Sequence, residues 1–293
     1  MSSGGGDAPR VTVREVLARK QRGERLVMVS AYDALFARLS EEGGADLILV
    51  GDSLANVILG LDSTVPVTVE QMIHHGAAVR RGATRALVVV DMPFMSYQVS
   101  TEDALRNAGR IMKETNAQAV KVEGGDDAIA ATVHAMTRAG IPVMGHIGFT
   151  PQSVNTLGGF RVQGRAPGDK ERLIEEARRL ESAGAFSVVL ELVPTAVSKS
   201  VTDAVAIPTI GIGAGVGTDG QILLCYDLLG VFTDFKPKFT KRFAKLTEVA
   251  VGGIREYVKE VKEGSFPDDD HSYTVNDAEY DKFAAMVAKR RQV

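Results

Sequence analysis

Four apolar segments of this chain each end in an acidic residue. An uninterrupted apolar run of four to eight residues is typical of a parallel strand that is buried on both faces. A charge at the end of such a strand is unfavourable unless it is paired or binds something. The four acidic residues are Asp52 after LILVG, Asp91 after LVVV, Glu123 after VKV and Glu191 after VVL. Because ligands of α/β proteins bind at the carboxyl ends of the strands, these residues predict one shared site.

Strand-like and helix-like segments alternate along most of the chain, which predicts βαβ units and a parallel sheet. Eight expected strands occupy the region from residue 26 to about residue 235. That length suits a single α/β domain with the architecture of a (βα)8 TIM barrel, and a doubly wound open sheet is the second interpretation. The expected strands are residues 26–31, 46–51, 86–91, 119–123, 142–145, 187–192, 209–212 and 222–226.

Helix-like patterns fill most of the intervals between these strands. Thr68 lies three residues before Gln71, which is the spacing of a capping box at the start of a helix. An extra N-terminal helix is expected before the first strand, and C-terminal helices are expected after the last. The expected helices are residues 11–23, 69–81, 101–116, 126–139, 169–182, 195–205, 237–263 and 277–290.

Composition and charge exclude several classes of protein. The formal net charge of −3 provides no basic field that would attract nucleic acid. No apolar run approaches the roughly 18 residues of a membrane span. Cys225 is the only cysteine, so no intrachain disulfide can form, and this favours the cytoplasm. We expect a flexible leader over residues 1–10, a single barrel domain over 11–272, and a C-terminal extension of unassigned role over 273–293.

Side chains alternate between the two faces of a strand, so residues two positions apart lie on the same face. We call this rule residue parity and use it to group the candidate site residues. Lys121 and Glu123 share one face, and Asp52 shares its face with Ile48 and Val50. We interpret the common face of these strands as the barrel interior. The four carboxylates are then expected to converge above the core, with Lys121 among them.

A cluster of carboxylates predicts a metal site. Carboxylate oxygens are hard ligands that suit Mg²⁺ or Mn²⁺ better than zinc. Like charges packed together raise one another's pKa unless a cation neutralises them, and a metal ion together with Lys121 would do so. The alternative for a single residue such as Asp52 is a helix N-cap. Four carboxylates at the same ends of four strands favour the site.

Three further features are weaker candidates. His146 ends the fifth expected strand and is expected to face the site. Ser53 is either a turn residue or a donor to an anionic group at exposed backbone N–H groups. The glycine run over residues 211–215 resembles a phosphate-binding loop, but no Gly-Lys-Ser/Thr follows it, which favours tight packing of the strand and loop.

Long segments of the chain resemble, in order, the ketopantoate hydroxymethyltransferase family. The resemblance covers roughly residues 11–272. It rests on VGDSLANVILG (50–60), DSTVPVT (62–68), HHGAAVRRGA (74–83), DMPFMSY (91–97), VKVEGG (120–125), GHIGFTPQSVN (145–155), GGFRVQGR (158–165) and IPTIGIGAGVGTDGQILLCYD (207–227). So many long motifs in one order are far more specific than any single signature.

The resemblance implies a (βα)8 barrel of the phosphoenolpyruvate/pyruvate type. The implied reaction transfers a one-carbon unit from 5,10-methylenetetrahydrofolate to 3-methyl-2-oxobutanoate, which gives 2-dehydropantoate and tetrahydrofolate on the route to pantothenate. The implied cofactor is Mg²⁺, one per subunit. The implied partners are the oxo acid, the folate and other copies of the chain in a cytoplasmic homo-oligomer, a decamer.

The resemblance also implies roles for particular residues. Asp52, Asp91 and Glu123 match the residues of the magnesium site. Ser53 and Lys121, with Asp52 and Asp91, match the residues around the bound oxo acid. Glu191 matches the base that removes the C3 proton and forms an enolate. The electrophile is either the methylene iminium of the folate or formaldehyde released from it.

Two other functions suit the same barrel. The first is a magnesium-dependent lyase or mutase of the isocitrate lyase/phosphoenolpyruvate mutase type, but lyases of that type carry a cysteine in a catalytic loop and Cys225 is not placed for that role. The second is a catalytically dead barrel that binds a 2-oxo acid. The complete set of four carboxylates and Lys121 argues against the second.

Overall fold

The structure is a computed structural model that describes residues 9–233 and 237–290. The chain divides into two compact units, Met1–Ala244 and Lys245–Val293, and each is described by itself. The domain bounds expected from the sequence, 11–272 and 273–293, stay a prediction beside this division. Residues 1–8 of the expected leader lie outside the described residues.

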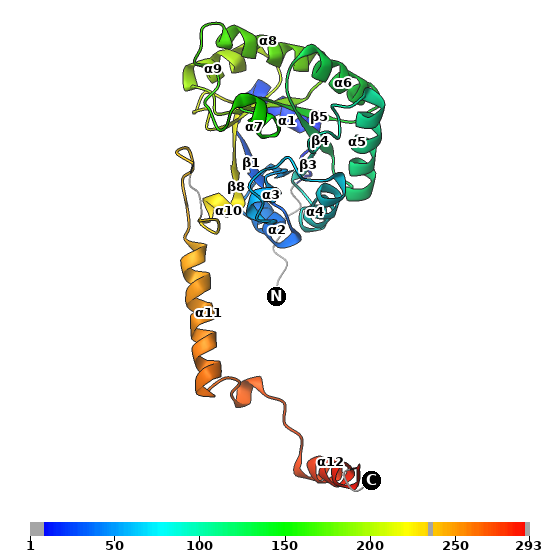
Figure 1. The fold of residues 1–293 in the computed structure, drawn as a ribbon, viewed down its shortest axis with the longest axis vertical. Coiled ribbons are helices and arrows are strands. Elements are labelled where there is room, and N and C mark those ends of the chain that lie inside the picture. Colours follow the sequence, from blue (N-terminus) through cyan, green and yellow to red (C-terminus); the bar gives the residue numbers. More distant parts are fainter. Residues whose placement is uncertain (1–8, 234–236, 291–293) are drawn as a thin grey trace. The chain divides into compact units, whose positions relative to one another are not determined.

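The first unit is a closed barrel of parallel strands that follow one another in chain order (Figure 1). The strands are β1 (Leu26–Ser30), β2 (Leu47–Val50), β3 (Leu87–Asp91), β4 (Ala119–Glu123), β5 (Val143–Gly148), β6 (Ser187–Glu191), β7 (Thr209–Ile212) and β8 (Gly220–Leu224). The pairing of β1 with β8 closes the barrel, in a register that places Met28 opposite Ile222. The expected barrel is therefore confirmed, and an open sheet is excluded.

The last strand begins two residues earlier than expected, at Gly220 instead of residue 222. A Cβ atom at Gly220 would lie 2.6 Å from the Leu26 carbonyl oxygen, so only glycine allows the backbones of β8 and β1 to approach here. An apolar run does not reveal such a position. The strand also ends earlier than expected, at Leu224 instead of residue 226, because Cys225–Leu228 forms the short helix α10.

Helices surround the barrel (Figure 1). They are α1 (Val13–Arg22), α2 (Ala34–Glu42), α3 (Leu54–Val57), α4 (Val69–Gly82), α5 (Thr101–Thr115), α6 (Asp127–Arg138), α7 (Val154–Leu157), α8 (Asp169–Ser182) and α9 (Thr195–Ala204), with a 3-10 turn η1 at Pro151–Ser153. The capping box of Thr68 and Gln71 is present at the start of α4. Helix α2 was not expected, because its Leu35 and Leu39 are 60% and 46% exposed and do not mark its buried face.

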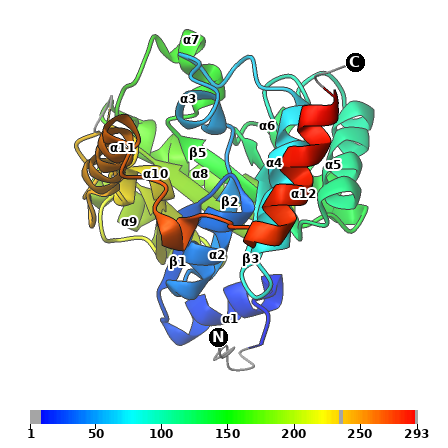
Figure 2. The ribbon, with the colours of Figure 1, turned by 90° about the horizontal axis from the view of Figure 1, so that it is seen from below.

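The strands separate two apolar cores. The inner core fills the barrel with residues such as Leu47, Leu49 and Val89, and the outer core packs alternate strand residues such as Ile48 against the helices. Helix α1 lies at one end of the barrel, opposite α3 and α7 (Figure 2). Its Val16 belongs to the inner core. The barrel interior is thus closed at the end from which the strands begin, and the loops that follow the strands form the other end.

The second unit contains α11 (Leu246–Glu263), the 3-10 turn η2 (Asp269–His271) and α12 (Asp277–Arg290). The bounds of α12 agree with the expected terminal helix. Helix α11 forms the C-terminal part of the expected helical region 237–263, but the expectation is wrong for residues 237–245, which are not helical. No residue of α11 is buried. Among the described helices, none combines the length and the apolar character needed to cross a membrane.

Candidate functional site

The strand register brings the acidic residues and two basic residues together at the carboxyl end of the barrel. Asp91 at the end of β3 lies opposite Lys121 of β4, and Glu123 lies opposite His146 of β5. Glu191 ends the next strand, β6. The parity expected for these residues is correct, because residues two positions earlier, such as Val89, belong to the inner core.

Asp52 reaches the same place by a different route. Ile48 and Val50 pack in the outer core, so the interpretation that Asp52 reaches the interior through their shared face is wrong. The strand β2 ends at Val50, and the chain turns through Gly51 before Asp52. The backbone N–H of Asp52 donates to Asp91 Oδ2 at 3.0 Å, which holds the two acidic residues beside each other. Parity cannot be carried past the end of a strand.

Lys121 is the positive centre of this cluster. Its Nζ lies 2.7 Å from Asp91 Oδ1 and 3.7 Å from Glu123 Oε1, and all three side chains are at most 4% exposed. Burial works against the ammonium form, but Asp91, Glu123 and Asp52 outweigh it and raise the pKa of Lys121 above its ordinary value. Lys121 is therefore charged at neutral pH.

His146 bridges two carboxylates. Its Nδ1 lies 3.3 Å from Glu123 Oε1 and its Nε2 lies 3.3 Å from Glu191 Oε2, at angles that make ion pairs without aligned hydrogen bonds. Burial and Lys121 both oppose the imidazolium form. Glu123 and Glu191 outweigh them and raise the pKa of His146 to about 9. A protonated His146 holds Glu191 in position from the interior side.

The carboxylates differ in their electrostatic state. Burial, followed by the charges of Asp91 and Glu123, raises the pKa of Asp52 well above its usual range. Burial also raises the pKa of Asp91, although Lys121 acts in the opposite direction. For Glu123 burial opposes ionisation, but His146 and Lys121 outweigh it and lower the pKa. Asp52 is thus the carboxylate with the greatest need for additional positive charge.

A neutral network that the sequence analysis missed holds the carboxylates in place. Gln152 of η1 donates from Nε2 to Asp52 Oδ2 at 2.9 Å and from its backbone N–H to Glu123 Oε2 at 3.0 Å. Tyr97 donates its hydroxyl to Gln152 Oε1 at 2.8 Å and accepts from the backbone N–H of Glu123 at 3.0 Å. Both side chains are buried. They lie in the motifs DMPFMSY and GHIGFTPQSVN. The sequence analysis selected charged residues at strand ends, so neutral residues in these motifs were not recognised.

Ser53 lies at the start of α3, beside Asp52. Its Oγ is 2.8 Å from the hydroxyl of the buried Tyr32, and either oxygen can donate. The glycine run 211–215 packs tightly, because Cβ atoms at Gly211 and Gly215 would lie 2.7 and 2.2 Å from threonine side chains. The interpretation of this run as close packing is confirmed.

Glu191 is the most exposed carboxylate of the cluster. Its side chain is 15% exposed, whereas those of Asp91 and Glu123 are each 3% exposed. A base must reach its substrate, and Glu191 combines access from the loop end of the barrel with support from His146.

Asp52, Asp91 and Glu123 have the oxygen donors that suit Mg²⁺. Within the described residues, no three His, Cys, Asp or Glu side chains stand in an arrangement ready to coordinate a metal ion. Magnesium in proteins is usually held by one or two carboxylates and completed by water and substrate oxygens. Asp52 and Asp91 would supply these one or two carboxylates, and the hydrogen bond from the Asp52 backbone N–H to the Asp91 carboxylate keeps them side by side.

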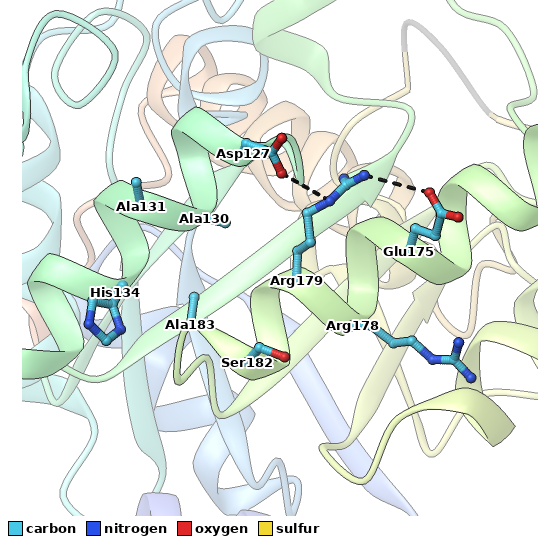
Figure 3. Close-up of a pocket in the computed structure, with 9 residues that line it drawn as sticks. All are labelled: Asp127, Ala130, Ala131, His134, Glu175, Arg178, Arg179, Ser182 and Ala183. Carbon is cyan, nitrogen blue, oxygen red and sulfur yellow. Dashed lines mark ion pairs between the residues drawn. The ribbon is translucent and has the colours of Figure 1, made fainter.

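A hollow of about 660 Å³ lies on the outside of the barrel between α6 and α8 (Figure 3). Its wall includes Asp127, His134, Arg178 and Arg179 and none of the residues of the acidic cluster. Arg179 pairs there with Asp127 at 3.1 Å. The hollow is therefore separate from the candidate site.

Two comparisons of the sequence with known proteins agree on a single family. The sequence profile of the family described as ketopantoate hydroxymethyltransferase matches residues 10–269. A 3-methyl-2-oxobutanoate hydroxymethyltransferase of Syntrophus aciditrophicus is 52% identical over 264 residues, which cover 90% of this chain and 97% of that protein. A protein of the same name from Carboxydothermus hydrogenoformans is 54% identical over 266 residues, 91% of this chain and 96% of its own.

Similar solved structures include 2,3-dimethylmalate lyase, a member of the PEP mutase/isocitrate lyase superfamily. It matches with a TM-score of 0.56 and 18% identity and covers 95% of this chain and 100% of its own. At this identity the likeness shows the fold alone.

Proposed function

Because the chain belongs to the ketopantoate hydroxymethyltransferase family, it is an enzyme that transfers a hydroxymethyl group to 3-methyl-2-oxobutanoate, and we propose how its residues do so. This proposal rests mainly on the buried acidic cluster, in which Glu191, with 15% of its side chain exposed, is the most accessible carboxylate. The one-carbon donor in this proposal is 5,10-methylenetetrahydrofolate. The products are 2-dehydropantoate, a precursor of pantothenate, and tetrahydrofolate, and one water molecule supplies the hydroxyl oxygen of the transferred group.

The proposed cofactor is one Mg²⁺ per subunit, held by Asp52 and Asp91 with Glu123 as the third acidic residue. The fit rests on charge, because burial and its acidic neighbours raise the pKa of Asp52, and a nearby cation would restore the ionised form. When bound, Mg²⁺ supplies a Lewis acid that stabilises negative charge forming on the keto oxygen.

The base of the proposed mechanism is Glu191. It accepts the proton from C3 of the oxo acid, which leaves an enolate whose C3 attacks the one-carbon unit. His146, 3.3 Å from Glu191, positions the carboxylate and balances its charge. A positioned carboxylate in this role contributes about 10²- to 10⁴-fold to the rate.

Asp52, Ser53, Asp91 and Lys121 are the proposed contacts of the oxo acid. Lys121 is charged and is held in place by Asp91. It therefore stabilises the negative charge that develops on the oxo acid without first having to rearrange. Tyr97 keeps the acidic residues in place, because its hydroxyl joins Gln152 to the backbone of Glu123. The proposal also includes a cytoplasmic homo-oligomer, a decamer, as the sequence resemblance implies.

Hydrogen exchange at C3 and complete turnover together test the mechanism. Wild-type protein, stripped of metal and titrated with Mg²⁺, should exchange the C3 proton of 3-methyl-2-oxobutanoate in D2O and form 2-dehydropantoate when methylenetetrahydrofolate is added. Glu191→Gln should lose both activities by at least about 10²-fold. Glu175→Gln is the matched control, because Glu175 is 65% exposed on the outer helix α8.

The outcomes separate the alternatives. Exchange without turnover at any folate concentration would contradict the proposed transfer. Metal-dependent binding of the acid with neither exchange nor turnover would favour a barrel that only binds it. Cleavage of isocitrate or methylisocitrate would favour a lyase. Full activity of Glu191→Gln would exclude Glu191 as the base.

A further inference from the structure

An aromatic ring lies exposed beside the end of the strand that carries Glu191. Phe160 is 71% exposed, an unusual state for a phenylalanine, and its ring rests on that of Phe149, which is fully buried. The ring centroids are 4.8 Å apart and the planes are inclined by 33°. Phe149 therefore supports one face of Phe160, and the exposed surface of Phe160 is free to receive another flat ring.

The loop that carries this ring is attached to the end of β6 at both of its ends. The backbone N–H of Phe149 donates to the Glu191 carbonyl at 2.8 Å. Fourteen residues later, the N–H of Gln163 donates to the Leu192 carbonyl at 2.8 Å. The loop that carries Phe160 is thus anchored to the backbone of the proposed base, Glu191, and of the next residue, Leu192.

The neighbouring residue provides a cation. Arg161 is exposed, and within residues 9–233 and 237–290 no carboxylate forms an ion pair with it. Arginine binds carboxylates through its planar guanidinium group, often with two parallel hydrogen bonds. The loop therefore offers a flat apolar surface and, one residue away, an unpaired positive charge.

We propose that Phe160 is the platform on which the pterin ring of the one-carbon carrier stacks, with Arg161 binding the carboxylates of its glutamate tail. This inference rests on the proposed function. A reduced folate has a flat ring system at one end and carboxylates at the other, which matches the chemistry of this loop. Its one-carbon unit must also reach the enolate, which forms beside Glu191.

The KM for methylenetetrahydrofolate tests the platform. Phe160→Ala should raise this KM about three- to tenfold, the range given by one aromatic pair, whereas Phe160→Tyr, which keeps the ring, should remain near the wild-type value. The KM for 3-methyl-2-oxobutanoate should not change. Leu39→Ala is the control for loss of an exposed apolar side chain, because Leu39 lies on the outer helix α2 and is 46% exposed.

Salt dependence tests the cation. Arg161→Gln should raise the KM for the folate about two- to fivefold at low ionic strength, and this difference should shrink as salt is added, because exposed charges are screened. Arg178→Gln is the matched control, since Arg178 is an exposed arginine on the outside of α8 (Figure 3). It should show the wild-type KM at every salt concentration.

Exchange of the C3 proton distinguishes failure of this inference from failure of the proposed function, because exchange requires no folate. If wild-type protein exchanges and turns over but Phe160→Ala keeps the wild-type KM for the folate, the platform is refuted and the function stands. If Phe160→Ala slows exchange as strongly as turnover, Phe160 shapes the loop and is not a platform. If wild-type protein neither exchanges nor turns over, the proposed function itself is refuted.

Discussion

Removal of the Lys121 charge should destabilise the barrel strongly. With an effective dielectric constant of about 20, the attraction of Nζ to Asp91 over 2.7 Å is about 6 kcal/mol and to Glu123 over 3.7 Å about 4 kcal/mol. Desolvation of the ammonium group offsets much of this. Since loss of one partner of a buried ion pair lowers the free energy of unfolding by about 3–5 kcal/mol, Lys121→Met should do the same. The melting temperature should fall by about 6–20 °C.

The assay is urea unfolding without metal, at one protein concentration, arranged as a double-mutant cycle. The cycle contains wild type, Lys121→Met, Asp91→Asn and the double variant. Because Asp91→Asn removes the charge that Lys121 leaves unpaired, the double variant should be more stable than additivity predicts, by about 1–3 kcal/mol. The control is Lys199→Met, since Lys199 lies 2.7 Å from Asp203 but both side chains are more than 60% exposed. That variant should lose less than about 1 kcal/mol.

Two results would refute this reasoning. Equal losses for Lys121→Met and Lys199→Met would show that burial does not strengthen the pair. Strict additivity in the cycle would show that Lys121 and Asp91 are not energetically coupled, despite the 2.7 Å contact.

Four other predictions follow from the same geometry. His146 has a folded pKa of about 9, above the unfolded value of about 6.5, so its charge stabilises the fold fully below pH 6.5 and loses this effect as the pH rises through 9. Urea unfolding should therefore show His146→Gln less stable than wild type by up to about 3 kcal/mol at pH 6, with the difference vanishing near pH 10. The pKa of Asp52 is raised, so its ionisation lowers stability as the pH rises above about 4; calorimetry should show Asp52→Asn melting a few degrees higher than metal-free wild type and not responding to Mg²⁺. Gly148→Ala should lower stability by about 1–3 kcal/mol and reduce turnover, because φ is +93° and the new Cβ would lie 2.4 Å from the Glu191 carbonyl oxygen; wild-type activity would contradict this. Burial raises the pKa of the Cys225 thiol, so a thiol reagent should label no cysteine in the native protein and one in urea.

The sequence predicted most of the barrel because each buried strand carries its own apolar signal. The run before Asp91 became β3, and the run before Glu191 became β6. The apolar pattern did not predict helix α2, because its large apolar residues, Leu35 and Leu39, lie on the exposed face. The apolar pattern also missed the start of β8 at Gly220. That start depends on the close approach of Gly220 to Leu26, which lies far away in the sequence.

Residue parity was enough to bring Lys121 and Glu123 to one face, because alternation is a local property of an extended chain. It could not place Asp52, which lies beyond the end of β2, nor Gln152, which bonds Asp52 from 100 positions away. Neutral side chains such as that of Gln152 become recognisable only when their partners are known.

Local patterns along the chain therefore specified the class of fold, the strands and the set of acidic residues at their ends. The tertiary structure alone decided which carboxylate pairs with Lys121, which two carboxylates His146 bridges, and that Glu191 is the most exposed carboxylate of the cluster. The physical reason is that pairing, pKa and exposure depend on distances between neighbouring strands and on burial. Those quantities are established only when the barrel closes and the register between the strands is set.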